Sequence, residues 1–121
     1  LGCAVALANL EIFRKEKTLA GLRPKIAALA RWLPPLKQLD HVGEIRQRGL
    51  MVGIELVRNR ATKTPYPVGE RIGHRVAREA RTRGLLMRPI GNVIVLMPPL
   101  SASLAELQRM AAIVEASIRS L

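Results

Sequence analysis

Apolar side chains recur at helical spacing through the N-terminal part of the chain. In residues 1–16 the spacing places Leu7 and Leu10 on one face. In residues 18–32 it continues until two consecutive prolines remove the N–H groups that a helix needs. We therefore predict two helices, which together make residues 1–37 a helical lead-in to the remaining chain.

The next part of the chain has the alternation of a half-buried β-strand. The alternation is weak over residues 42–48 and clear from Leu50 to Val57, where every second residue is apolar. Gly49 lies between the two stretches, so we predict a hairpin that turns at Arg48-Gly49. Residues 58–68 contain two prolines and read as a loop.

Two further helices are predicted nearer the C-terminus. The first covers residues 69–83 and ends at Gly84, a residue suited to the position after a helix. Its five arginines predict a solvated face, with an anion-binding face as the alternative. The last covers residues 104–121 and opens with Ser103 and Glu106, which have the spacing of a capping box.

The most apolar run of the sequence is residues 84–100, and Arg88 is its one charge. Gly91-Asn92 divides the run into two short arms, a spacing typical of a two-residue β-hairpin, and two prolines stop the second arm. Burying an unpaired guanidinium costs several kcal/mol, so we expect Arg88 to meet an acid. That acid is a carboxylate of the protein or one that belongs to a ligand.

The order helix, helix, hairpin, helix, hairpin, helix predicts an α+β fold. We expect a small, mainly antiparallel sheet of two hairpins covered by helices. Residues 1–121 then form a single small domain, in which residues 42–121 are the sheet-and-helix unit. The chain begins without Met and inside an apolar helix, so we expect it to be the C-terminal part of a longer protein.

The composition of the chain limits the classes of partner that we expect it to bind. Hydrophobic residues make up 49% of the chain, which favours a globular protein. No apolar run reaches the roughly 18 residues of a membrane helix, and the single cysteine favours a cytoplasmic location. The net charge of +11 suits a nucleic-acid ligand, but the three aromatic residues are scattered and offer no stacking platform. We therefore expect no membrane partner, and the sequence argues against nucleic acid.

No group of side chains in the sequence supplies catalytic chemistry. His41 and His74 have no acidic or thiol neighbour at ligand spacing, so we expect surface or packing roles and no metal site. The five lysines lie in polar stretches, unlike a desolvated Schiff-base lysine. Cys3 is expected to be a small buried hydrophobe, and Met87 and Met97 are expected to fill the core.

Four stretches of the chain resemble the C-terminal part of class III aminotransferases, which are fold-type-I enzymes that use pyridoxal phosphate. They are Leu1–Ala8, Arg48–Leu56, Gly84–Pro89 and Val95–Leu100. The resemblance covers essentially the whole chain. The Arg-Pro pair and the Met-Pro-Pro ending are most similar to family members of biotin synthesis, with an ω-amino-acid or diamine aminotransferase as the alternative.

The resemblance implies a role for Arg88, which corresponds to the arginine that receives the carboxylate of a small-molecule keto substrate. It also implies amino-group transfer from adenosylmethionine to 8-amino-7-oxononanoate and a homodimer. Pyridoxal phosphate is then bound mainly by residues upstream of this segment, including the Schiff-base lysine. The 121 residues alone are therefore expected to be inactive.

Two readings from other functional classes stay open beside the resemblance. The first is a stand-alone basic module that binds nucleic acid, with affinity that falls steeply with salt. The second is a structural or oligomerisation domain in which Arg88 forms an internal salt bridge with Glu44 or Glu55.

Overall fold

The computed structural model describes all residues from Leu1 to Leu121. Its helices are α1 (Gly2–Lys15), α2 (Thr18–Trp32), α3 (Ile72–Thr82) and α4 (Leu104–Arg119), with short 3₁₀ helices η1 (Pro34–Gln38) and η2 (Val68–Glu70). Its strands are β1 (Val42–Arg48), β2 (Met51–Asn59), β3 (Thr64–Pro65) and β4 (Val93–Leu96). The predicted α+β class is confirmed. None of the helices is long and apolar enough to cross a membrane.

The sheet is built around β2, and every pairing is antiparallel. Strand β1 precedes it in a hairpin that turns at Gly49, whose φ of +62° suits glycine. Strand β4 pairs with the other edge of β2, so that Ile54 lies opposite both Ile45 and Ile94. The short strand β3 pairs with the end of β2 and lies in the stretch predicted as a loop.

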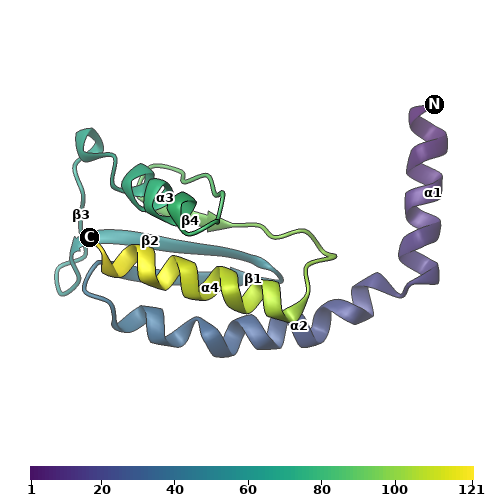
Figure 1. Cartoon of the computed structure of the whole chain (residues 1–121), viewed down its shortest axis with the longest axis horizontal. Coiled ribbons are helices and arrows are strands. Elements are labelled where there is room, and N and C mark those ends of the chain that lie inside the picture. The colour runs from purple at the N-terminus through teal and green to yellow at the C-terminus, as the bar shows by residue number, and fades with distance from the viewer.

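Three helices cover one face of this sheet. They lie side by side in the order α2, α4, α3, as Figure 1 shows. The alternating residues Val52, Ile54 and Leu56 of β2 are fully buried beneath them. The opposite face carries charged side chains, among them Glu44 and Arg46 of β1. The alternation along β2 therefore decides which face receives the helices.

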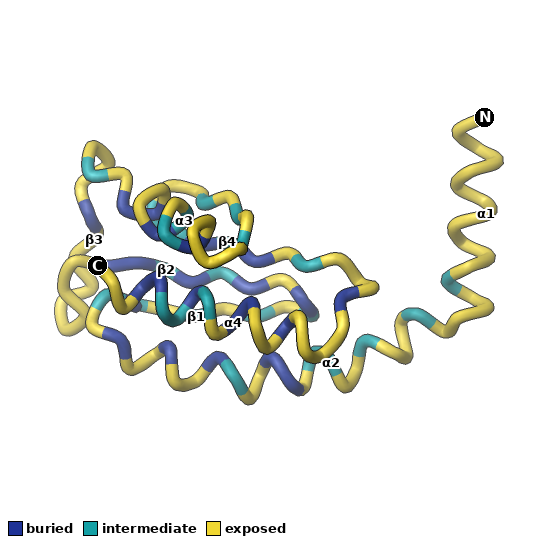
Figure 2. The backbone as a smooth tube through the Cα atoms, viewed as in Figure 1, coloured by how far each residue is buried: buried dark blue, intermediate teal, exposed yellow.

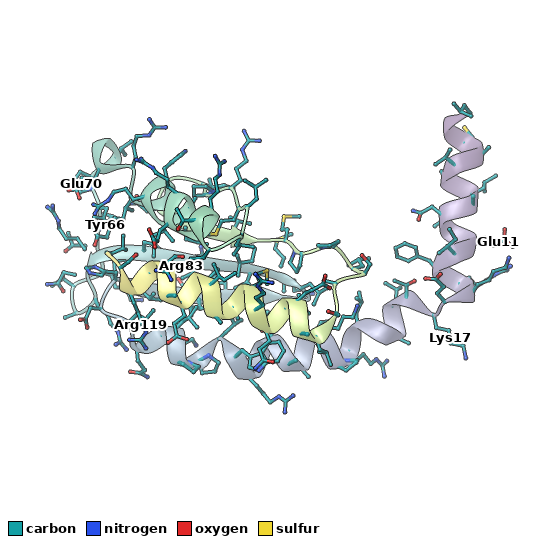
Figure 3. All side chains as sticks on the ribbon, viewed as in Figure 1. Glu11, Lys17, Tyr66, Glu70, Arg83 and Arg119 are labelled. Atoms are coloured by element: carbon teal, nitrogen blue, oxygen red, sulfur yellow. The ribbon has the colours of Figure 1, made fainter.

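Helix α1 projects from this layered body. It has no buried residue, and all of its residues except the half-buried Phe13 are exposed, as Figure 2 shows. Lys17, with a φ of +50°, makes the bend between α1 and α2, where Figure 3 labels it. The prediction that Cys3 is buried is wrong, because Cys3 is exposed, like every residue of α1 before Phe13.

Helix α3 ends as the sequence predicted. Gly84 has a φ of +89°, its N–H donates to the Arg81 carbonyl, and the N–H of Leu85 donates to the Ala80 carbonyl at 2.9 Å. These two bonds are those of a Schellman motif. The helix begins at Ile72 instead of residue 69, because η2 precedes it and Arg71 takes a left-handed conformation.

Only one of the two predicted arms of the second hairpin is a strand. The turn at Gly91-Asn92 is present, and Ile90 and Val93 exchange backbone hydrogen bonds of 2.8 and 2.9 Å across it. Before Ile90, however, the first arm is extended without pairing to any strand. Pro89 contributes to this difference because it has no N–H to donate.

Helix α4 opens with the predicted capping box. The N–H of Glu106 donates to Ser103 Oγ at 3.2 Å, and the N–H of Ser103 donates to Glu106 Oε2 at 2.7 Å. The two residues thereby satisfy amides that the helix itself leaves without partners.

Candidate functional site

Arg88 lies on the outward side of the unpaired arm. Because side chains of an extended chain alternate between two sides, Leu85 and Met87 pack against the core while Leu86 and Ile90 face out with Arg88. Leu86 is 76% exposed and Ile90 is 71% exposed. The expectation that the guanidinium is embedded is therefore wrong for this chain: Arg88 is exposed, although two large apolar side chains flank it.

No carboxylate of the chain pairs with Arg88. None of the six ion pairs in the structure includes it. Glu44 and Glu55, the two partners considered from the sequence, instead lie 3.4 and 3.8 Å from Arg46. The alternative in which Arg88 forms an internal salt bridge with Glu44 or Glu55 is therefore wrong, and the Arg88 guanidinium has no acidic partner within these 121 residues.

On one side of Arg88 is an open groove of about 580 Å³, here called the apolar groove. It lies between the unpaired arm, the end of β4 and the start of α4, and its apolar lining includes Leu86, Met87, Val95, Met97 and Met110. Met97 was predicted to be a core residue. That prediction is wrong, because Met97 is 68% exposed along this groove.

Glu106 is the one acidic residue that lines the apolar groove. Its Oε2 accepts hydrogen bonds from the Ser103 N–H at 2.7 Å and the Ser103 hydroxyl at 2.8 Å. Both bonds lower the pKa of the Glu106 carboxyl, and the bond from the backbone N–H has the larger effect. Glu106 is thus engaged in capping α4, and it forms no ion pair with Arg88 or with any other cation of the chain.

On the other side of Arg88 is a hollow of about 880 Å³ along α3, here called the basic hollow. Its positive lining consists of Arg71, Arg75, Arg78, Arg81 and Arg88, none of which forms an ion pair. The one carboxylate in the lining, that of Glu70, is 2.7 Å from Arg58. Clustered like charges raise the local concentration of anions, so the two hollows together suit an anion with an apolar chain.

The chain does not offer a Schiff-base site for pyridoxal phosphate. No lysine lines the apolar groove or the basic hollow. Lys15 is 3.1 Å from Glu11, and Lys25 donates to the Leu100 carbonyl at 2.7 Å from an exposed position. The residues present therefore do not fit the reactive end of this cofactor. No group of three potential metal ligands gathers in the structure either.

Sequence reasoning missed a cluster that holds the turn beyond Arg88. The Tyr66 hydroxyl and His41 Nδ1 are 2.6 Å apart, and the side-chain amide of Asn92 donates to the Tyr66 carbonyl at 2.8 Å. Burial, followed by the charge of Glu70, raises the pKa of Tyr66. Figure 3 shows Tyr66 and Glu70 at the same end of the sheet. No local pattern signals this cluster, because its members are 25 and 26 residues apart.

Comparison with known protein families assigns the chain to one of them. The family model described as "Aminotransferase class-III" matches residues 1–118. The chain belongs to the class III aminotransferases. This aminotransferase chain is 55% identical over 118 residues to a protein of Nitratidesulfovibrio vulgaris named adenosylmethionine-8-amino-7-oxononanoate aminotransferase, and the match covers 98% of this chain and 22% of that protein.

Solved structures agree with the family. The crystal structure of adenosylmethionine-8-amino-7-oxononanoate aminotransferase from Methanocaldococcus jannaschii matches with a TM-score of 0.95 and 47% identity, over 98% of this chain and 27% of that one. A structure titled as the PMP-bound form of an aminotransferase from Vibrio fluvialis matches with a TM-score of 0.92 and 28% identity, over 98% and 26% of the two chains. The aminotransferase chain thus spans about a quarter of the length of these relatives.

Proposed function

We propose that the chain is the C-terminal small domain of an enzyme that moves an amino group from adenosylmethionine to 8-amino-7-oxononanoate. The names of the relatives from N. vulgaris and M. jannaschii support this reaction at 55% and 47% identity. Residues 1–37 are the helical lead-in of this domain, and residues 42–121 are its sheet-and-helix unit.

The observation that carries the proposed role of this segment is the unpaired guanidinium of Arg88. It lies between exposed Leu86 and Ile90, beside the apolar groove, and has no acid of the chain to neutralise it. A planar guanidinium binds a carboxylate through two parallel hydrogen bonds. We therefore assign Arg88 to the carboxylate of the keto acceptor.

The apolar neighbours of Arg88 explain how an exposed arginine binds selectively. Two opposite charges 4 Å apart attract by about 1 kcal/mol in bulk water and by about 4 kcal/mol at the effective dielectric near a protein surface. An acceptor with an aliphatic chain lies against Leu86 and the groove, displaces water from both partners and moves the pair toward the stronger regime. A short carboxylate that stays fully hydrated gains less binding free energy from Arg88.

The cofactor and the oligomer belong to the same proposal. Pyridoxal phosphate, when bound by the complete enzyme, would supply the electron-withdrawing chemistry that amino-group transfer needs. The residues that bind it, including the Schiff-base lysine, are proposed to lie outside this chain, since no lysine here lines either hollow. The complete enzyme is proposed to be a homodimer.

Amino-transfer by the complete protein that contains this chain tests the proposal. We expect amino-group transfer when adenosylmethionine and 8-amino-7-oxononanoate are both supplied, and no turnover by the 121 residues alone. Transfer from an ω-amino acid or a diamine, without use of adenosylmethionine, would instead support the related ω-aminotransferase activity. Turnover by the short chain alone would refute the assignment of the lysine to another part of the protein.

A further inference from the structure

Backbone hydrogen bonds do not hold the segment around Arg88 in place. Residues 86–89 belong to no helix or strand and make no backbone–backbone hydrogen bond. The segment is fixed only at its ends, by the Schellman bond of Leu85 to Ala80 and by the pair Ile90–Val93. Between these points the position of Arg88 depends on side-chain packing.

Helix α3 approaches this segment closely at Gly73, which is buried. A Cβ atom added to Gly73 would lie 2.8 Å from Pro89 Cβ and closer still to the carbonyl oxygen of Gly91. Carbon atoms in ordinary contact are about 3.5 Å apart or more. Glycine is therefore the residue that allows α3 to approach the segment at both Pro89 and Gly91.

The Gly91 side of this contact has little freedom to yield. Gly91 has a φ of +57° in a two-residue turn, and the carbonyl of the next residue, Asn92, accepts from the Leu56 N–H at 2.8 Å. The Asn92 side chain donates to the Tyr66 carbonyl. A side chain at position 73 would consequently displace Pro89, which no backbone hydrogen bond restrains, and would also push α3 back from the Gly91 carbonyl.

We propose that Gly73 is a positioning residue for Arg88. By leaving out a side chain, it sets the depth at which Pro89 packs and thereby the place of the neighbouring guanidinium at the rim of the apolar groove. A glycine within a helix is intrinsically less favourable than alanine, and this contact explains its presence at position 73. The inference rests on the proposed function of Arg88.

Gly73→Ala in the complete enzyme tests the inference with two acceptors, the keto acid and its carboxamide. A displacement near 1 Å lowers rates by up to about 100-fold, so we expect kcat/KM for the keto acid to fall about 10- to 100-fold, mainly through KM. The carboxamide, which has no charge for Arg88, keeps its kcat/KM. A purely structural defect would reduce both acceptors equally, so equal losses would overturn the inference.

Gly21→Ala is the matched control, because Gly21 also lies within a helix and an added Cβ there meets nothing within 4 Å. We expect it to leave both acceptors unchanged. Arg88→Ala distinguishes the two proposals. If Arg88→Ala lowers keto-acid use and Gly73→Ala does not, only the positioning role of Gly73 is refuted. If Arg88→Ala has no effect, both proposals are refuted.

A second variant keeps the inference testable if Gly73→Ala does not fold. Pro89→Ala introduces no clash but removes ring atoms of Pro89 that pack beside Gly73. We expect it to raise KM for the keto acid several-fold and to leave the carboxamide unchanged. An unchanged ratio between the two acceptors in this variant would overturn the positioning role.

Discussion

Substitution of Arg88 tests the contribution that we propose for this segment to the activity of the complete enzyme. Arg88→Ala removes the guanidinium and leaves the extended backbone and the flanking Leu86 and Ile90 in place. Arg88→Lys keeps a positive charge but removes the planar pair of donors that matches a carboxylate. The two variants therefore separate the contribution of charge from that of hydrogen-bond geometry.

The expected magnitude depends on how far bound substrate covers an arginine that is exposed in this chain. Ion pairs that stay exposed contribute about 0.2–1 kcal/mol, whereas truncating one partner of a buried charge pair costs about 2–5 kcal/mol. Leu86, Ile90 and the apolar groove favour the second case, because an aliphatic acceptor that covers them also displaces water from Arg88. We therefore expect Arg88→Ala to lower kcat/KM by about 30-fold to several thousand-fold.

The assay compares kcat/KM for the keto acid in the wild-type enzyme and in both variants. Arg88→Lys is expected to lose about tenfold, since one charge-assisted hydrogen bond of the fork remains. Arg81→Ala is the matched control: Arg81 is another unpaired arginine of the basic hollow, and its loss changes the net charge equally. A loss in Arg88→Ala no greater than that in Arg81→Ala would refute the specific role of Arg88 and leave only a general field of positive charge.

Three further predictions concern stability, measured by urea denaturation of the complete protein. Tyr66→Phe removes the hydroxyl that meets His41 Nδ1 and is expected to cost about 0.5–1.5 kcal/mol. The pKa of Tyr66 is raised from 10.0 in the fold, so its contribution to folding stability is complete below about pH 10 and is lost as pH rises through the folded value. The wild type should therefore lose more stability in alkali than the Phe variant. The lowered pKa of the Glu106 carboxyl has the opposite effect on how stability depends on pH. Its contribution to stability is present above about pH 4.5 and is lost as pH falls through the folded value. Glu106→Gln should remove this acid dependence. Ile54 is fully buried at the centre of β2. Ile54→Ala is expected to lower the free energy of unfolding by about 2–5 kcal/mol and Ile54→Val by about 0.5–1.5 kcal/mol. Equal losses would contradict the close packing of the core.

Local patterns predicted the elements whose causes are local. The Ser103–Glu106 capping box and the end of α3 at Gly84 each depend on residues no more than five positions apart, and both are present. The β1–β2 hairpin likewise follows from alternation on either side of Gly49. Such elements are predictable because the residues that determine them are adjacent in sequence.

The features that the sequence did not reveal depend on what covers a residue. An apolar neighbourhood in sequence suggested that Arg88 and Cys3 are buried, but the alternation of the extended arm turns Arg88 outward, and Cys3 lies in the fully exposed first part of α1. The contact of Tyr66 with His41 and the approach of Gly73 to Pro89 join residues far apart in the chain. Periodicity carries no information about such contacts.

A crystal structure of the complete enzyme with its keto acceptor bound tests the role of Arg88 most directly. We predict both carboxylate oxygens of the acceptor at about 2.7–2.9 Å from the Arg88 guanidinium, with the aliphatic chain against the apolar groove. A guanidinium that instead pairs with an acidic residue of the protein, while the substrate carboxylate binds elsewhere, would contradict the account.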